Sequence, residues 1–283
     1  MIYNSLVNAT RKLLWVIGRR LYLWSRNELT NNPETNGEYS LLKKILKNKN
    51  KNDNYEIVMM DIGANIGEWA NQALLHTAKR HDLNTKVFVF EPTVDTFNTL
   101  KMNLSSYENV VFNNIAVSNY VGIIDFYIHD DKNSKTNSIF IKEGRKTSVE
   151  ATTIDQYVES CNIKNINYIK CDTEGNDFNV ILGAEKSLDS EIIELFQFEY
   201  NHRWINAKCF LKCVFDFIDG KNYFLGRITK NTIEIYQNWH PEMERFFEAN
   251  YILINKNETE VIAMSRFETF DRRNIISCEA NND

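Results

Sequence analysis

The chain has 283 residues, 43% of them hydrophobic and 25% charged, and its 33 basic against 38 acidic side chains give a formal net charge of -5. This globular composition is long enough for one large α/β domain with appendages or for two small domains. The acidic excess argues against a general electrostatic grip on nucleic acid, and five cysteines without a CxxC pair fit a reduced, cytoplasmic setting better than a disulfide framework.

The N-terminal segment predicts a helix from about Leu6 to Trp24. Its apolar run at 13–17 follows two basic residues, as in a signal sequence, but Arg19 and Arg20 interrupt it and no small-residue cleavage site follows. A span of the bilayer would need about 18 apolar residues. Two interpretations stay open: an arm that packs on its own domain or on a second subunit, or a helix that lies on an anionic membrane at the inner face.

The segment from Asn27 to Asn54 predicts a linker around one short helix near Tyr39 to Lys47. We therefore assign residues 1–54 to an N-terminal helical arm and linker. The main domain is expected over residues 55–255, and residues 256–283 are expected to form a polar tail.

Five apolar, β-rich runs alternate with helical stretches along the main domain, which predicts a parallel sheet with helices on both faces. The runs are Glu56–Asp61, Val87–Glu91, Val110–Ile115, Tyr168–Asp172 and Leu195–Glu199. Four of the five end in Asp or Glu. Open parallel sheets bind ligands at the carboxyl edge, so we expect these acids to converge on one crevice.

Two segments depart from this alternation. Runs at Gly122–Ile128 and Thr147–Ala151 predict strands around a polar stretch, His129–Ser138, which is a candidate cover for the site. Further along, Tyr223–Ile228 and Thr232–Tyr236 predict a hairpin. A short helix after Pro241 and a run at Tyr251–Ile254 then predict an antiparallel ending to the sheet.

The strongest motif is Asp61-Ile-Gly-Ala-Asn-Ile-Gly67, which combines a strand end, a glycine turn and a helix start. Gly63 and Gly67 let the backbone approach a ligand closely, but their GxxxG spacing is not the GxGxxG dinucleotide fingerprint. Asp61 would repel a pyrophosphate and suits a ligand with a cationic end, such as S-adenosylmethionine (SAM). At the end of the next strand, Glu91 is placed to accept hydrogen bonds from ribose hydroxyls.

Over about residues 55–255 the sequence resembles the FkbM-type SAM-dependent methyltransferases. The resemblance rests on the motif at 61–67 and on Phe90-Glu-Pro92, Asn114-Ile-Ala-Val-Ser118, Thr153-Ile-Asp155 and Ile169-Lys-Cys-Asp-Thr-Glu-Gly175. It implies a Rossmann-like class I α/β fold with a mostly parallel seven-stranded sheet and an antiparallel C-terminal strand. Cys171 and Thr173 stand where aliphatic residues are more usual in the family.

The resemblance also implies where SAM binds. The methionine part would be bordered by Asp61, Gly63, Ala64, Asn65 and Gly67. The ribose would be held by Glu91 beside Pro92. The adenine would lie near Asn114, Ile115 and Ala116.

Members of the family methylate hydroxyls on sugars and other natural products. The resemblance therefore implies an O-methyltransferase acting on a sugar or glycan precursor of a surface polysaccharide. The alternatives are a non-sugar natural-product hydroxyl as acceptor, or a catalytically idle SAM-binding interaction protein. An NAD-linked dehydrogenase is disfavoured because the third glycine of its fingerprint is missing.

An alcohol acceptor needs a group that takes its proton. His202 is the first choice because an ordinary histidine pKa of about 6.5 suits the task. Asp172 would then position SAM or the substrate, while Glu174 and Glu199 orient the acceptor. In a second route, Asp172, Glu199 and Asn201 hold Mg²⁺ or Mn²⁺, which lowers the pKa of the acceptor hydroxyl. Both routes, and a monomer or a homo-oligomer, stay open.

Overall fold

The computed structural model describes residues 2–28, 31–48, 56–80, 84–128, 139 and 144–278. Five strands form the parallel half of the main sheet in the order β3-β2-β1-β7-β8. They are β1 (Ile57–Ile62), β2 (Thr85–Phe90), β3 (Val110–Asn113), β7 (Tyr168–Cys171) and β8 (Leu195–Tyr200). The five predicted runs are therefore confirmed as neighbouring parallel strands.

The other half of the sheet is mostly antiparallel. Next to β8 lies β11 (Ala249–Asn255), followed by β9 (Tyr223–Ile228) and β10 (Ile233–Tyr236), each antiparallel to its neighbour. The predicted hairpin and antiparallel ending are thus confirmed.

The sheet continues past the seven strands that we expected. Beyond β10 come β12 (Arg266–Phe270) and β13 (Ile276–Cys278), so the described residues contribute ten strands to one sheet. The seven-stranded order runs from β3 to β9, and β10, β12 and β13 extend it. Residues 256–278, which belong to the segment predicted as a polar tail, form α9 (Thr259–Ala263) and two of these extra strands.

Successive side chains of the central strands face opposite sides of the sheet, as the period of a β-strand requires. In β1, Ile57 and Met59 pack into one apolar cluster, whereas Val58, Met60 and Ile62 pack into the other. One face is covered by α2 (Glu38–Asn48), α3 (Glu68–Ala78), α4 (Val94–Asn103) and α9. The opposite face is covered by α5 (Ile154–Cys161), α6 (Asp177–Leu182), α7 (Glu185–Asp189) and α8 (Leu211–Ile218).

The predicted short helix near 39–47 is α2, and it belongs to the core. Its apolar stripe of Leu41, Leu42, Ile45 and Leu46 is buried in the same cluster as β1 and α3. The boundary expected at residue 54 therefore divides elements that share one core.

A smaller sheet follows β3 and consists of β4 (Ala116–Val117), β6 (Arg145–Thr152) and β5 (Gly122–Ile128). Both predicted strand segments of this region are confirmed as the antiparallel pair β5–β6. The candidate cover at His129–Ser138 lies outside the described residues.

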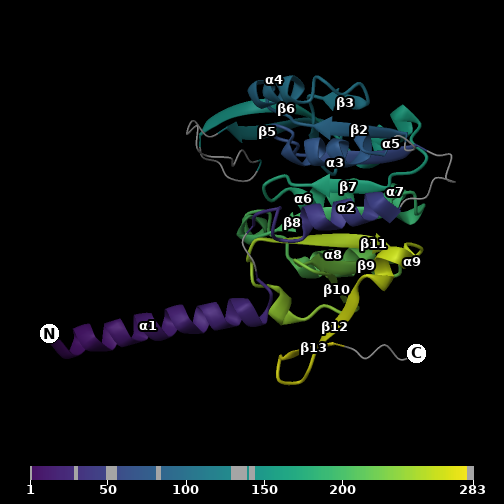
Figure 1. The fold of residues 1–283 in the computed structure, drawn as a ribbon. Coiled ribbons are helices and arrows are strands. Elements are labelled where there is room, and N and C mark those ends of the chain that lie inside the picture. The colour runs from purple at the N-terminus through teal and green to yellow at the C-terminus, as the bar shows by residue number, and fades with distance from the viewer. Residues whose placement is uncertain are drawn as a thin grey trace.

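The predicted N-terminal helix is α1 (Ile2–Ser25), and Figure 1 shows it extended away from the sheet and its covering helices. A large set of apolar side chains along it is exposed. None of the helices in the described ranges is long and apolar enough to cross a membrane.

Candidate active site

The carboxyl ends of β1, β2, β7 and β8 surround a cavity of about 620 Å³. This volume lies within the range of small-molecule sites. Eight of the lining residues are Asp or Glu and two are Lys or Arg. The four acids that end the predicted strands, Asp61, Glu91, Asp172 and Glu199, all line it, so the expected convergence is confirmed.

The turn after β1 lines the cavity with residues 63–66. Gly63 has a φ of 78°, and a Cβ built on it would lie 2.0 Å from the carbonyl oxygen of Asp172. The amides of Gly63 and Ala64 donate to the carbonyl of Phe90 at 3.0 and 2.9 Å. Only glycine fits at this position, because the turn lies directly against the end of β7.

Gly67 has a different role. It has a φ of 90° at the start of α3, and a Cβ there would meet Leu100 Cδ1 of α4 at 2.7 Å. It does not line the cavity, so its small size allows helix packing rather than ligand contact.

Asp61 is buried beneath this turn, with 3% of its surface exposed. Its Oδ2 accepts a hydrogen bond from the amide of Ala70 at 3.2 Å. Burial raises the pKa of Asp61 to about 7, although the charge of Lys170 opposes this shift. A cationic group bound beside Asp61 would favour the ionised form.

Glu91 is held rigidly at the end of β2. Its Oε2 accepts from the amide of Asn65 at 3.2 Å, and its Oε1 accepts from the amide and hydroxyl of Thr93 at 3.0 and 2.6 Å. Asn114 lies behind the cavity wall and donates to the carbonyls of Glu91 and Pro92 at 2.8 and 3.1 Å. It therefore supports this turn and does not line the cavity.

Apolar side chains form the wall beyond Glu91. They are Pro92, Ile115, Ala116, Phe126 and Ile139. Such a wall suits a flat aromatic base.

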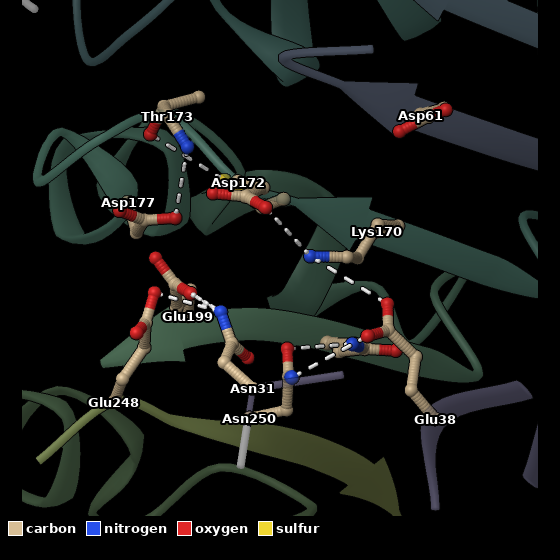
Figure 2. A network of polar contacts seen from close by, with 12 residues as sticks. Asn31, Glu38, Asp61, Lys170, Asp172, Thr173, Asp177, Glu199, Glu248 and Asn250 are labelled. Atoms are coloured by element: carbon tan, nitrogen blue, oxygen red, sulfur yellow. Dashed lines mark hydrogen bonds and ion pairs between the residues drawn. The ribbon is translucent and has the colours of Figure 1, made fainter. Parts of the chain in front are cut away.

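A network of carboxylates and amides surrounds Lys170 and Asp172 (Figure 2). The Nζ of Lys170 lies 3.3 Å from Asp172 Oδ2 and 3.7 Å from Glu38 Oε1. On the other side, Asn31 Nδ2 donates to Glu199 Oε1 at 3.1 Å and to Glu248 Oε1 at 2.7 Å. Residues from the N-terminal arm thus complete a site otherwise built from the sheet edge.

The electrostatics of this network are dominated by negative charge. Burial alone would lower the pKa of Lys170, but its acidic neighbours raise it well above the ordinary value. Burial and the nearby Asp172 carboxylate raise the pKa of Glu199. The same two causes raise the pKa of Glu174 to about 8, even though Glu174 pairs with Arg203 at 3.0 Å. A cationic ligand bound here would favour the ionised forms of these acids.

His202 is not brought to the cavity. It is exposed at the start of η1 (His202–Ile205) and is absent from the lining. A proton acceptor must come within hydrogen-bond reach of its substrate, directly or through one water. The position of His202 gives no support to the role predicted for it.

Asn201 is committed to other partners. Its Nδ2 donates to Glu199 Oε2 at 2.6 Å, and its Oδ1 accepts from the amide of Arg203 at 2.8 Å. Asn201 is also buried and does not line the cavity, so the structure gives no support to the metal route predicted through Asp172, Glu199 and Asn201. Within the described ranges, no group of three or more His, Cys, Asp or Glu side chains is arranged to hold a metal ion.

Several lining residues were not predicted. They are Asn31, Glu38, Tyr39, Trp69, Lys170, Arg203, Glu248 and Asn250, among others. Lys170 stands inside the motif at 169–175, two positions before Asp172, and the alternation of a strand places both side chains on one face. The other unpredicted lining residues reach the cavity through tertiary packing, and no motif in the sequence around them indicates this.

The residues present fit SAM. The site offers a glycine turn, buried acids for the cationic end of SAM, an acid at the ribose position and an apolar wall. The indole Nε1 of Trp69, a lining residue, is buried and has no acceptor among the described residues. An anionic group bound within reach of this N–H, such as a carboxylate, would satisfy it.

The pattern of the Methyltransferase FkbM domain matches residues 61–253. The Hexuronic acid methyltransferase AglP of Haloferax volcanii is 27% identical over 172 residues. The alignment covers 60% of this chain and 66% of AglP, so the chain spans slightly less than two thirds of that relative.

Solved structures overlap with the chain at low similarity. The N-terminal domain of human METTL16 has a TM-score of 0.44 at 8% identity, covering 77% of this chain and 67% of that chain. A putative rRNA-methylase from Clostridium thermocellum has a TM-score of 0.43 at 10% identity, covering 80% and 97%. TrmK of M. capricolum, solved with S-adenosylhomocysteine, has a TM-score of 0.38 at 12% identity, covering 82% and 71%.

Proposed function

The chain belongs to the FkbM methyltransferase family, and from this premise we propose that it transfers the methyl group of SAM to a hydroxyl of a saccharide. The observation that carries the proposal is the acid-lined cavity at the carboxyl edge of the sheet, which suits a sulfonium and ammonium ligand. The name of AglP, a hexuronic acid methyltransferase, supports an acceptor of the saccharide class. We propose a glycan precursor of surface polysaccharide type.

Four contacts would hold SAM. Asp61 and the turn at 63–65 would receive the ammonium end, and the Trp69 Nε1 would donate to the neighbouring carboxylate. Glu91 would bind the ribose with the remaining lone pair of Oε2. The adenine would rest on the wall formed by Pro92 and residues 115–116.

When bound, SAM supplies a methyl group already activated by its sulfonium. The acceptor oxygen forms a bond to the methyl carbon as the carbon–sulfur bond breaks, and the hydroxyl proton must go to the protein. We assign this proton to Asp172, whose side chain is 40% exposed at the cavity. Lys170, 3.3 Å away, pairs with this carboxylate and would hold it in position. Alignment of the two reactants would supply the rest of the rate enhancement.

The charge distribution also bears on the acceptor. Both cationic side chains among the described lining residues are paired, Lys170 with Asp172 and Glu38, and Arg203 with Glu174. The carboxylate of a uronic acid would thus find no unpaired cation among the described lining residues. We therefore favour a neutral saccharide, whose hydroxyls can bond to Asn31 and Glu199.

Titration calorimetry with SAM and with NAD⁺ tests the cofactor, and failure to bind SAM would overturn the proposal. Methyl transfer from labelled SAM to a panel of neutral and uronic saccharides tests the acceptor. Neutral sugars should be methylated faster, and a preference for uronic acids would refute the charge argument. The cytoplasmic location, the inner membrane face as a contact and a homo-oligomer stay predictions.

A further inference from the structure

The helix α1 has two chemically distinct faces. At about 100° of rotation per residue, Leu13, Leu14, Ile17, Leu21 and Trp24 fall within an arc of about 100°. Arg11, Lys12 and Arg19 fall within an arc on the opposite side, and Arg20 lies at the edge of the apolar arc. The helix is therefore amphipathic along its length.

The apolar face of α1 lacks a partner in the described structure. Its five side chains are between 46% and 82% exposed. A continuous apolar stripe of this kind on a soluble surface marks an interaction site rather than scattered surface apolar residues.

The opposite face is the one that meets the rest of the protein. The guanidinium of Arg19 lies 5.0 Å from the centre of the Phe247 ring, and that of Arg245 lies 6.0 Å from the centre of the Tyr22 ring. Both Arg19 and Tyr22 belong to the side of the cationic arc. The apolar face is consequently turned away from the sheet.

Buried ion pairs fix the base of the helix. Glu28 Oε1 lies 2.7 Å from Arg227 of β9 and 2.6 Å from Arg245. Arg227 also donates to the carbonyl of Arg26 at 2.6 Å. The direction of α1 is thus tied to the sheet by charged contacts, because breaking one partner of such a buried pair is costly.

We propose that α1 docks the protein on the surface of an anionic lipid bilayer, lying in the plane of the interface with its apolar face inserted. The helix contains four basic and no acidic residues, so it complements negative headgroups. Trp24, on the apolar face, suits the headgroup level, and Arg20 can extend its charge outward.

Docking would also fix the position of the cavity. Asn31, which lines the cavity, follows Ser25 by six residues, a chain length of at most about 20 Å. The cavity wall at Asn31 would therefore stay within that distance of the docked helix.

Co-sedimentation of the full chain with phosphatidylcholine vesicles, with and without phosphatidylglycerol, tests the proposal. We expect partitioning at least about tenfold stronger with the anionic lipid, and weaker at high salt. Ile17→Asp should lower it about a hundredfold, because apolar burial is lost as well as charge. Asn8→Asp is the matched control on the cationic arc and should lower it only about fivefold.

Equal partitioning into both vesicle types, or equal losses for the two variants, would overturn the proposal. So would a dimer that Ile17→Asp dissociates, seen by sedimentation velocity without vesicle binding, since a second copy would then be the partner. SAM affinity should be unchanged in both variants, which separates a docking defect from a failure to fold and from a failure of the proposed enzyme function.

Discussion

Replacement of Asp61 by Asn tests whether the acid at the head of the glycine turn receives a cationic ligand. Asparagine keeps the shape of the side chain and an oxygen for the Ala70 amide, so the fold should survive. Because burial raises the pKa of Asp61 to about 7, about half of the ligand-free protein carries a proton there at neutral pH. A cationic ligand must displace that proton.

The expected pH dependence follows from this pKa. If SAM binds only the ionised form, its affinity should fall about 16-fold between pH 7.0 and pH 5.5, since the ionised fraction falls by that factor. Stability should show the opposite trend. The folded protein holds this proton more tightly than the unfolded chain, so the free energy of unfolding should decrease as the pH rises from about 4 to about 7, by up to about 4 kcal/mol.

Calorimetric titration of SAM at both pH values, in buffers of different ionisation enthalpy, measures the affinity and the released proton together. Asp61→Asn should bind SAM at least about tenfold more weakly at pH 7.0, because a hydrogen bond to a charged group is lost. It should also lose most of the pH dependence. An equal pH dependence in the variant and the wild type would assign the proton to another group and refute the reasoning.

Four further variants test the rest of the site. Asp172→Asn should lower kcat by about 10²- to 10⁴-fold in a methyl-transfer assay. His202→Ala should leave kcat unchanged because His202 is exposed outside the cavity, and the reverse result would restore His202 as proton acceptor. Trp69→Phe keeps the stacking on Tyr168 but removes the unpartnered N–H, so calorimetry should show SAM binding at least about tenfold weaker, and equal affinity would contradict the assigned contact. Lys170→Met leaves buried acids without a cation and should cost about 3–5 kcal/mol in urea unfolding; a cost below about 1 kcal/mol would show that this pair contributes little.

The parts of the fold that could be predicted are those with a local signal. The sequence predicted four strand ends correctly because each combines an apolar run with a terminal acid: Asp61, Glu91, Asp172 and Glu199. A parallel sheet brings such ends to one edge. The close backbone approach at Gly63 could be predicted because the turn needs a positive φ there and the end of β7 leaves no space for a side chain.

The parts that were missed depend on contacts distant in sequence. Asn31 bonds to Glu199 and Glu248, more than 160 residues away, and nothing near Asn31 indicates this. The interpretation of His202 depended on its ordinary pKa, but the turn that follows β8 points it to solvent. The strands at 266–270 and 276–278 are short and polar at an edge, so they lack the apolar run that identifies a central strand.

The segment that the family shares is shorter than the segment that builds the cavity. Four residues upstream of the family pattern line the cavity: Asn31, Pro33, Glu38 and Tyr39. The family pattern begins at residue 61, yet one wall of the pocket is encoded upstream of it. A shortened protein that begins at residue 55 would keep the family pattern and lose that wall together with the counter-charge of Glu38. Acceptor preference in such enzymes can therefore diverge in a segment that comparison of the shared domain alone would never inspect.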